Sequence, residues 1–199
     1  MLRKSVLGAC RRFTVALIAA VVLGPSLPAQ SALRFPDAWV GRWAGTLTTY
    51  APPDSVRNTI PITIEIAREA SGAGYTWLTV FNRDTVRGLR PYRLVVEDFA
   101  RGRYATDEGN GVLLYETYIG GVLTSVFQVQ TRVLESRHTV HGDTLVHELT
   151  WWDTAPTRTV KGSGANAEGS AEIRSFRVQG LQRAMLVRQR LPSSTTRPE

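Results

Sequence analysis

The stretch 133–152 constrains the fold more than any other part of the sequence, because it sets both a strand pairing and its register. Two runs of strand-forming residues flank Gly142-Asp143. Glycine at the first central position favours a two-residue type II′ hairpin turn, since that position has a positive φ. The numbers of opposed residues then sum to 285, so His138 faces His147. This stretch therefore predicts an antiparallel hairpin with a defined register.

The register assigns every side chain of this hairpin to one face, because neighbouring side chains of a strand point to opposite faces of the sheet. The face that we expect to point inward carries Leu134, Ser136, His138, Val140, Leu145, His147, Leu149 and Trp151. The other face carries more charge. There we expect the opposite charges of Arg137 and Glu148 to pair across the two strands.

A second two-residue hairpin is indicated by Gly120-Gly121, which separates the strand-like runs 112–119 and 122–130. Opposed residues here have numbers that sum to 241, so Glu116 faces Ser125. Their face is the more apolar of the two. We therefore expect both polar side chains to point inward.

Alternation of apolar and polar residues, rather than helical periodicity, also dominates the rest of the chain. The remaining expected strands are 39–50, 59–67, 75–82, 85–90, 92–98 and 103–106. A final strand or pair of strands is expected at 175–190, interrupted at Gly180 by a bulge. Pro61 cannot donate a backbone hydrogen bond, so we expect it near a strand start or on an edge. Eight to ten short strands joined by tight turns predict an all-β fold, an antiparallel up-and-down β-barrel without exposed edges.

The first thirty residues have the pattern of an export signal. Basic residues precede an uncharged apolar run at 13–23, which ends at a Gly-Pro pair before small residues. This run is shorter than the ~20 residues of a membrane-spanning helix, so an uncleaved anchor is the less favoured alternative. We expect a periplasmic or extracellular protein without an integral membrane span in its mature chain. Its expected parts are a signal peptide at 1–30, a single barrel domain at 36–190 and a disordered tail at 191–199.

The predicted signal alters what charge and cysteine content imply. Four of the 24 basic residues and none of the 17 acidic residues lie in it, so the remainder has a net charge of +3. Such a mild excess is typical of a solvated surface and does not indicate nucleic-acid binding. The only cysteine, Cys10, also lies in the signal. We therefore expect no disulfide, thiol nucleophile or cysteine metal site in the mature chain.

The segment Trp39-Val40-Gly41-Arg42-Trp43 resembles the Gly-x-Trp start of lipocalin-like (calycin) barrels. In that family the tryptophan closes one end of the barrel and an arginine near the end of the last strand packs over it. The resemblance implies that Arg183 or Arg188 takes this place. Thr106-Asp107-Glu108 matches only part of the family's middle motif, and the family's disulfide is missing. The chain is also similar to small exported bacterial domains of unknown function, a likeness that implies a fold and a compartment but no activity.

Polar residues on the inward faces predict a ligand site. A barrel of about eight strands holds either its own packed side chains or one small ligand, and its buried polar groups form a local network or contact that ligand. Our main hypothesis is a small apolar or amphipathic molecule bound in a cavity of at least ~300 Å³. The expected ligand-binding residues are His138, His147, Glu116, Ser125, Ser136 and Trp151.

Two other classes of function stay open from the sequence. The facing histidines, with Glu116, would suit the acid–base groups of an enzyme or the ligands of a metal ion or haem. An outward Trp152 would suit a carbohydrate-binding module. The sequence contains no nucleophile elbow, phosphate-binding glycine loop or His-Glu-x-x-His motif. We therefore assign no catalytic residue, no metal ligand and no cofactor.

Overall fold

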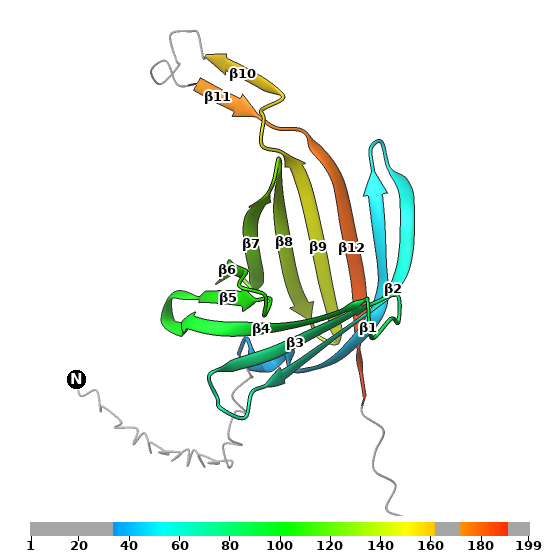
Figure 1. The fold of residues 1–199 in the computed structure, drawn as a ribbon, viewed down its shortest axis with the longest axis vertical. Helices are drawn as coiled ribbons and strands as arrows, with labels where there is room; N and C mark the ends of the chain where they lie inside the picture. The colour runs from blue at the N-terminus through cyan, green and yellow to red at the C-terminus, as the bar shows by residue number, and fades with distance from the viewer. Residues whose placement is uncertain (1–33, 162–171, 191–199) are drawn as a thin grey trace, which may run out of the picture. The chain divides into compact units, whose positions relative to one another are not determined.

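The structure is a computed structural model that describes residues 34–161 and 172–190. The predicted signal peptide at 1–30 and the predicted tail at 191–199 lie outside the described residues. The described chain is all-β: ten antiparallel strands close into an up-and-down barrel, and two short strands form a separate sheet (Figure 1). This confirms the predicted fold class.

The barrel follows the chain from neighbour to neighbour. Its strands are β1 (Gly41–Ala51), β2 (Ser55–Arg68), β3 (Gly74–Phe81), β4 (Leu89–Asp98), β5 (Arg103–Asp107), β6 (Leu113–Ile119), β7 (Val122–Val129), β8 (Arg132–His141), β9 (Thr144–Asp153) and β12 (Val178–Gln189). The small sheet of β10 (Arg158–Lys161) and β11 (Glu172–Ser175) is inserted between β9 and β12. Because β12 pairs with both β9 and β1, the ten strands close into a ring.

Helical structure among the described residues consists of two short 3-10 turns, η1 (Asp37–Trp39) and η2 (Phe99–Arg101). Neither these turns nor anything else within 34–161 and 172–190 forms a helix that is long and apolar enough to cross a membrane.

The strand β2 shows why these sequences form half-buried strands. Ile62, Ile64 and Ile66 point inward and are at most 2% exposed, whereas Glu65 between them is exposed. β-Branched side chains favour the extended backbone, and the alternation buries one face while solvent covers the other. Pro61 lies in the middle of β2 rather than near its start, but β3 pairs with β2 only from Ile62 onward. It therefore lies where β2 is an edge on the β3 side.

Both glycine-led hairpins have the predicted registers. Gly142 has a φ of 58°, and His138 pairs with His147 across β8 and β9. At the other turn, Gly120 and Gly121 have φ values of 59° and 84°, and Glu116 pairs with Ser125 across β6 and β7. Two successive positive φ values are typical of a type I′ turn. The turn residues thus determined which side chains face the interior.

The predicted ion pair between Arg137 and Glu148 is wrong, although the two residues are opposed as expected. Glu148 lies on β9 between β8 and β12, and on the β12 side it is opposed by Arg183. The Nε of Arg183 donates to Oε1 of Glu148 at 2.7 Å. A residue on an internal strand of a sheet has one neighbour on each of the two flanking strands. The hairpin register identified only the neighbour of Glu148 on β8.

The predicted strand at 85–90 is also wrong over most of its length. The carboxylate of Asp84 accepts hydrogen bonds from the backbone N–H groups of Val86 (3.0 Å) and Arg87 (2.8 Å), which hold a turn there. The following strand, β4, begins at Leu89 and continues through Pro91. By contrast, the expected bulge in the last strand is confirmed, because the pairing of β12 with β9 shifts between Val178 and Gly180.

Aromatic side chains fill one end of the barrel. Phe35 stacks on Tyr118 with ring centroids 4.2 Å apart, and meets Trp39 and Tyr104 edge-to-face at 4.6 and 5.0 Å. Phe35, Trp39 and Tyr104 are at most 5% exposed. We call Phe35, Trp39, Tyr104 and Tyr118 the aromatic plug. Edge-to-face and offset-stacked rings are the favoured aromatic contacts, so the plug gives this end of the barrel a fixed packing.

Trp43 lies at the base of β1 and is fully buried. Its indole Nε1 donates to the carbonyl of Trp39 at 3.0 Å, and the guanidinium of Arg188 lies 4.0 Å from its ring centroid. The same guanidinium donates to the carbonyl of Ala38 at 2.9 Å. Of the two arginines that the family resemblance named, Arg188 is therefore the one that covers the tryptophan, whereas Arg183 binds Glu148.

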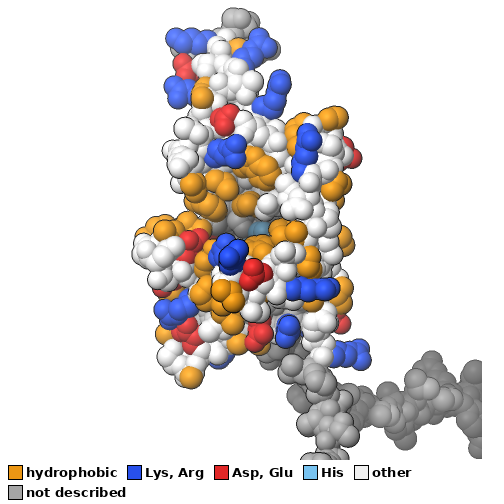
Figure 2. Space-filling view, turned by 45° about the vertical axis from the view of Figure 1, so that its right-hand side comes forward, with side chains coloured by type: hydrophobic (Ala, Val, Ile, Leu, Met, Phe, Trp, Pro, Cys, Tyr) orange, Lys and Arg blue, Asp and Glu red, His pale blue; other side chains and the backbone are white. Residues whose placement is uncertain are grey.

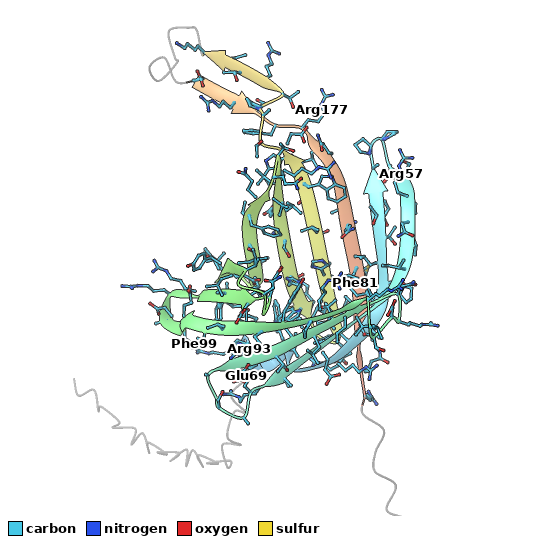
Figure 3. The ribbon with its side chains drawn as sticks, in the orientation of Figure 1. Arg57, Glu69, Phe81, Arg93, Phe99 and Arg177 are labelled. Carbon is cyan, nitrogen blue, oxygen red and sulfur yellow. The ribbon has the colours of Figure 1, made fainter. Side chains whose placement is uncertain are left out.

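Two charge contacts on the outside hold neighbouring elements near this end. Arg93 of β4 binds the carboxylate of Glu69 with its Nε (2.5 Å) and Nη2 (2.9 Å), so that the two side chains face one another (Figure 3). Asp37 of η1 accepts a hydrogen bond from the hydroxyl of Tyr75 at 2.8 Å and pairs with Arg68. These contacts connect η1 and β4 to the β2–β3 hairpin.

Candidate functional site

The barrel interior contains a cavity of about 180 Å³, which side chains from β2 to β9 line. Figure 2 shows a hollow bordered by hydrophobic side chains, with a basic and an acidic side chain beside it, in which histidine atoms are visible. The cavity is smaller than the ~300 Å³ that we expected, because bulky rings such as Trp77, Phe81 and Phe127 project into the barrel. It is nevertheless comparable with the roughly 150 Å³ that suffices for benzene in an engineered apolar cavity.

Five of the six predicted site residues line this cavity: Glu116, Ser125, Ser136, His138 and His147. The two confirmed hairpin registers bring them together, because β6, β7, β8 and β9 are adjacent strands. The sixth, Trp151, is not among the lining residues and packs over Gly180 of β12. A Cβ added at Gly180 would lie 2.1 Å from Cζ2 of Trp151. Trp151 therefore covers the glycine at the bulge.

The two histidines stack on each other inside the barrel. Their ring centroids are 4.4 Å apart at an interplanar angle of 26°, and the edge of Trp77 meets His138 at 5.1 Å. Burial lowers the pKa of His147 to about 4, and burial together with the neighbouring His147 lowers the pKa of His138 well below its usual 6.5. Both imidazoles are thus neutral at pH 7. Each then has one N–H donor and one acceptor nitrogen.

The Nδ1 of His147 is buried and has no hydrogen-bond partner among the described residues. A buried polar atom without a partner costs about 1–3 kcal/mol. His147 is one of the side chains that line the cavity. A ligand that reached this nitrogen would supply the missing hydrogen bond.

Glu116 is the second incompletely bonded group of the cavity. It is 9% exposed; its Oε1 accepts a hydrogen bond from the Thr106 hydroxyl at 2.6 Å, while Oε2 has no partner within the described chain. Burial raises the pKa of this carboxyl to about 7, against a smaller opposing effect of the Thr106 hydrogen bond. Near neutral pH, Glu116 can therefore change its protonation state when a ligand binds.

The two serines differ in their availability. The hydroxyl of Ser125 donates to the backbone carbonyl of Tyr115 at 2.9 Å, so its hydrogen is committed to the β6–β7 pair. Ser136 faces Ser125 across β7 and β8 and lines the same cavity. The hydrogen bond of Ser125 is therefore part of the local polar network that stabilises the strand pairing.

No group of three or more His, Cys, Asp or Glu side chains in the described parts of the chain is placed to hold a metal ion. Glu116 and the two histidines line the cavity but do not form such a group. Drug-sized ligands occupy pockets of ~300 Å³ or more, and haem is larger than such ligands. Haem therefore does not fit into this cavity of about 180 Å³ unless side chains move.

The sequence analysis identified only some of the residues that line the cavity. Thr106, the partner of Glu116, comes from β5, and the five-residue turn between β5 and β6 does not fix a register as a two-residue turn does. Trp77, in contrast, could have been found. It alternates with the inward Tyr75 and Thr79 along β3, within a strand that was predicted.

No protein-family model matches this sequence, and no curated protein matches it. Among solved structures, the barrel is similar to the crystal structure of a protein of unknown function from the DUF3598 family of Nostoc punctiforme, with a TM-score of 0.51 and 10% sequence identity. The match covers 75% of this chain and 47% of that chain, so this chain spans about half the length of the structure that it matches. A likeness at this identity concerns the fold and carries no function.

Proposed function

We propose that this protein is an exported, lipocalin-like barrel that binds one small apolar or amphipathic molecule in its interior. The observation that carries the proposal is the mainly apolar cavity lined by Glu116 and His147, each of which has one buried polar atom, Oε2 and Nδ1 respectively, without a partner among the described residues. Ligand pockets combine an apolar wall with a few convergent polar groups, and a ligand would satisfy both atoms.

The volume sets the size of the proposed ligand. About 180 Å³ suits a molecule with a single ring and a short substituent. Larger ligands would extend through the hollow visible in Figure 2.

The lipocalin likeness and the export draw on different observations. Arg188 over Trp43 repeats the arrangement that the Gly-x-Trp resemblance implied at the base of the barrel. This barrel has ten strands, whereas lipocalins have eight, so the proposal concerns the mode of ligand binding rather than membership of the family. Export draws only on the signal-like residues 1–30.

Filling the cavity is expected to abolish binding without unfolding the barrel. In Ser136→Leu, a branched apolar side chain would occupy space that Ser136 now borders, whereas Thr139→Leu places the same side chain on the opposite face of β8. Native mass spectrometry of each protein, purified from its own host, should show a small molecule on the wild type and on Thr139→Leu. The molecule should be lost from Ser136→Leu.

Circular dichroism of Ser136→Leu checks that the barrel is intact. Equal loading of a folded Ser136→Leu protein would place the ligand outside the cavity. A wild-type protein that never carries a small molecule, whether from its host or from an added panel of ring compounds, would contradict ligand binding altogether.

A barrel enzyme is the second candidate, and it draws on one observation. Burial raises the pKa of Glu116 to about 7, the range in which a carboxyl group serves well as a general acid or base. In that case Glu116→Gln should abolish turnover of the bound compound while the compound still binds. Recovery of the compound unchanged from wild-type protein argues for binding alone.

A further inference from the structure

The charged side chains that line the cavity are all acidic. Among the described residues that line it are two carboxyl side chains, Glu108 and Glu116, and no lysine or arginine. The two histidines are stacked and buried, and a positive charge on either would be placed against the other ring. The lining therefore offers negative charge to a ligand, while the guanidinium of Arg90, which is not part of the lining, lies 6.0 Å from the ring centroid of Phe81.

The buried carboxylate is incompletely bonded. Oε1 of Glu116 has only the Thr106 hydroxyl, and Oε2 has no partner among residues 34–161 and 172–190. A carboxylate in an apolar interior is stable as an anion only if a cation or several hydrogen bonds compensate for the lost water. The described chain supplies one hydrogen bond, so Glu116 either keeps its proton or gains its counter-charge from a ligand.

The walls of the cavity suit a cation as well. Four aromatic side chains, Trp77, Phe81, Tyr92 and Phe127, line it together with aliphatic residues. The faces of aromatic rings attract ammonium groups, and the attraction increases when water is excluded. An acidic group combined with aromatic walls is the chemistry that recognises an amine.

We propose that the ligand is a small organic cation, a protonated amine on a ring-sized apolar body, whose ammonium group lies against the carboxyl group of Glu116 and whose body contacts the aromatic wall. This inference rests on the proposed ligand-binding function and specifies its chemical class. An anion of the same size would meet two carboxyl groups and no counter-charge among the lining residues. A neutral analogue would lack the charge that compensates Glu116.

Three benzene derivatives of nearly equal size separate these possibilities: benzylamine (a cation), benzyl alcohol (neutral) and benzoate (an anion). Isothermal titration calorimetry at pH 8 is expected to give an affinity at least tenfold higher for benzylamine than for benzyl alcohol, and no binding of benzoate. Glu116→Gln should abolish the preference for benzylamine and keep the binding of benzyl alcohol. Glu65→Gln removes a carboxylate from the exposed face of β2 and should bind like the wild type.

The pH dependence gives a second readout of the same contact. Because burial raises the pKa of Glu116 to about 7, the affinity for benzylamine should fall by up to tenfold per pH unit below 7 in the wild type and stay flat in Glu116→Gln. The other titratable groups that face this carboxyl are His138, His147, Glu108, Tyr92 and Tyr104. Glu108→Gln tests the second carboxyl, and the pH dependence should persist in it.

The outcomes distinguish the two levels of the proposal. If none of the three compounds binds, the proposed ligand-binding function fails. If benzyl alcohol binds as tightly as benzylamine, the cavity binds ligands but the inference of a cationic ligand is overturned. The inference is also overturned if the preference for benzylamine survives in Glu116→Gln or is lost in Glu108→Gln alone.

Discussion

Replacement of Trp43 by alanine is expected to lower the free energy of unfolding by about 3–5 kcal/mol, the usual cost of removing a large, fully buried aromatic side chain. Trp43 is 0% exposed. The change removes its hydrogen bond to the carbonyl of Trp39 and its contact with the guanidinium of Arg188. The loss should therefore weaken the closure between β1 and β12 as well as the core.

Urea denaturation at pH 7 measures this effect. Trp152→Ala is the matched control, because Trp152 is only half-buried and lies on the other face of β9 from the cavity-lining residues. We expect it to lose about 1 kcal/mol or less, as substitutions outside the core usually do. Equal losses in the two variants would show that Trp43 does not hold the base of the barrel.

Replacement of Glu116 by glutamine is expected to change how the stability of the barrel depends on pH. The folded-state pKa of Glu116 is about 7, above the 4.5 of an ordinary glutamate, so the folded state holds the proton more tightly. Its contribution to stability is complete below pH 4.5 and is lost as the pH rises through 7, by up to about 3 kcal/mol. Glu116→Gln keeps the shape of the neutral carboxyl and lacks this loss.

The histidines act in the opposite direction. Their folded-state pKa values lie below 6.5, so their contribution is present above pH 6.5 and is lost as the pH falls toward 4. The wild type and Glu116→Gln both contain the two histidines. The difference in unfolding free energy between these two proteins therefore isolates the contribution of Glu116. We expect the unfolding free energy of Glu116→Gln, relative to wild type, to rise by about 3 kcal/mol between pH 4 and pH 8. A difference that stays constant with pH would mean that Glu116 is ionised and solvated in the barrel.

Short turns explain why so much of the site could be predicted from the sequence. A two-residue turn leaves one possible register, so the turns at Gly142 and Gly120-Gly121 are enough to place Glu116, Ser125 and both histidines inside. The alternation of apolar and polar residues predicted in addition which side chains of β2 point inward. Closure of the barrel was also expected, because the sequence has many short strands and no crossover helices.

The remaining features depend on contacts that no local pattern encodes. β9 pairs with β12 although the two-stranded sheet of β10 and β11 lies between them in the sequence. The partner of Glu148 and the position of Trp151 over Gly180 therefore could not be predicted. Thr106 lies across a turn too long to fix a register. The cavity volume depends on how far large side chains reach inward, which alternation does not reveal.

The central claim is that one small molecule binds inside this barrel, and isoleucine methyl groups report on it most directly. Ile62 and Ile64 line the cavity, whereas Ile119 and Ile173 are 70% and 55% exposed on the outside. In methyl-labelled protein titrated with benzyl alcohol and benzylamine, NMR spectra should show saturable 1:1 shifts of the Ile62 and Ile64 methyl signals, caused by the ligand's ring. The Ile119 and Ile173 signals should stay in place. Shifts confined to Ile119 or Ile173, or no saturable shift at any isoleucine, would contradict an interior binding site.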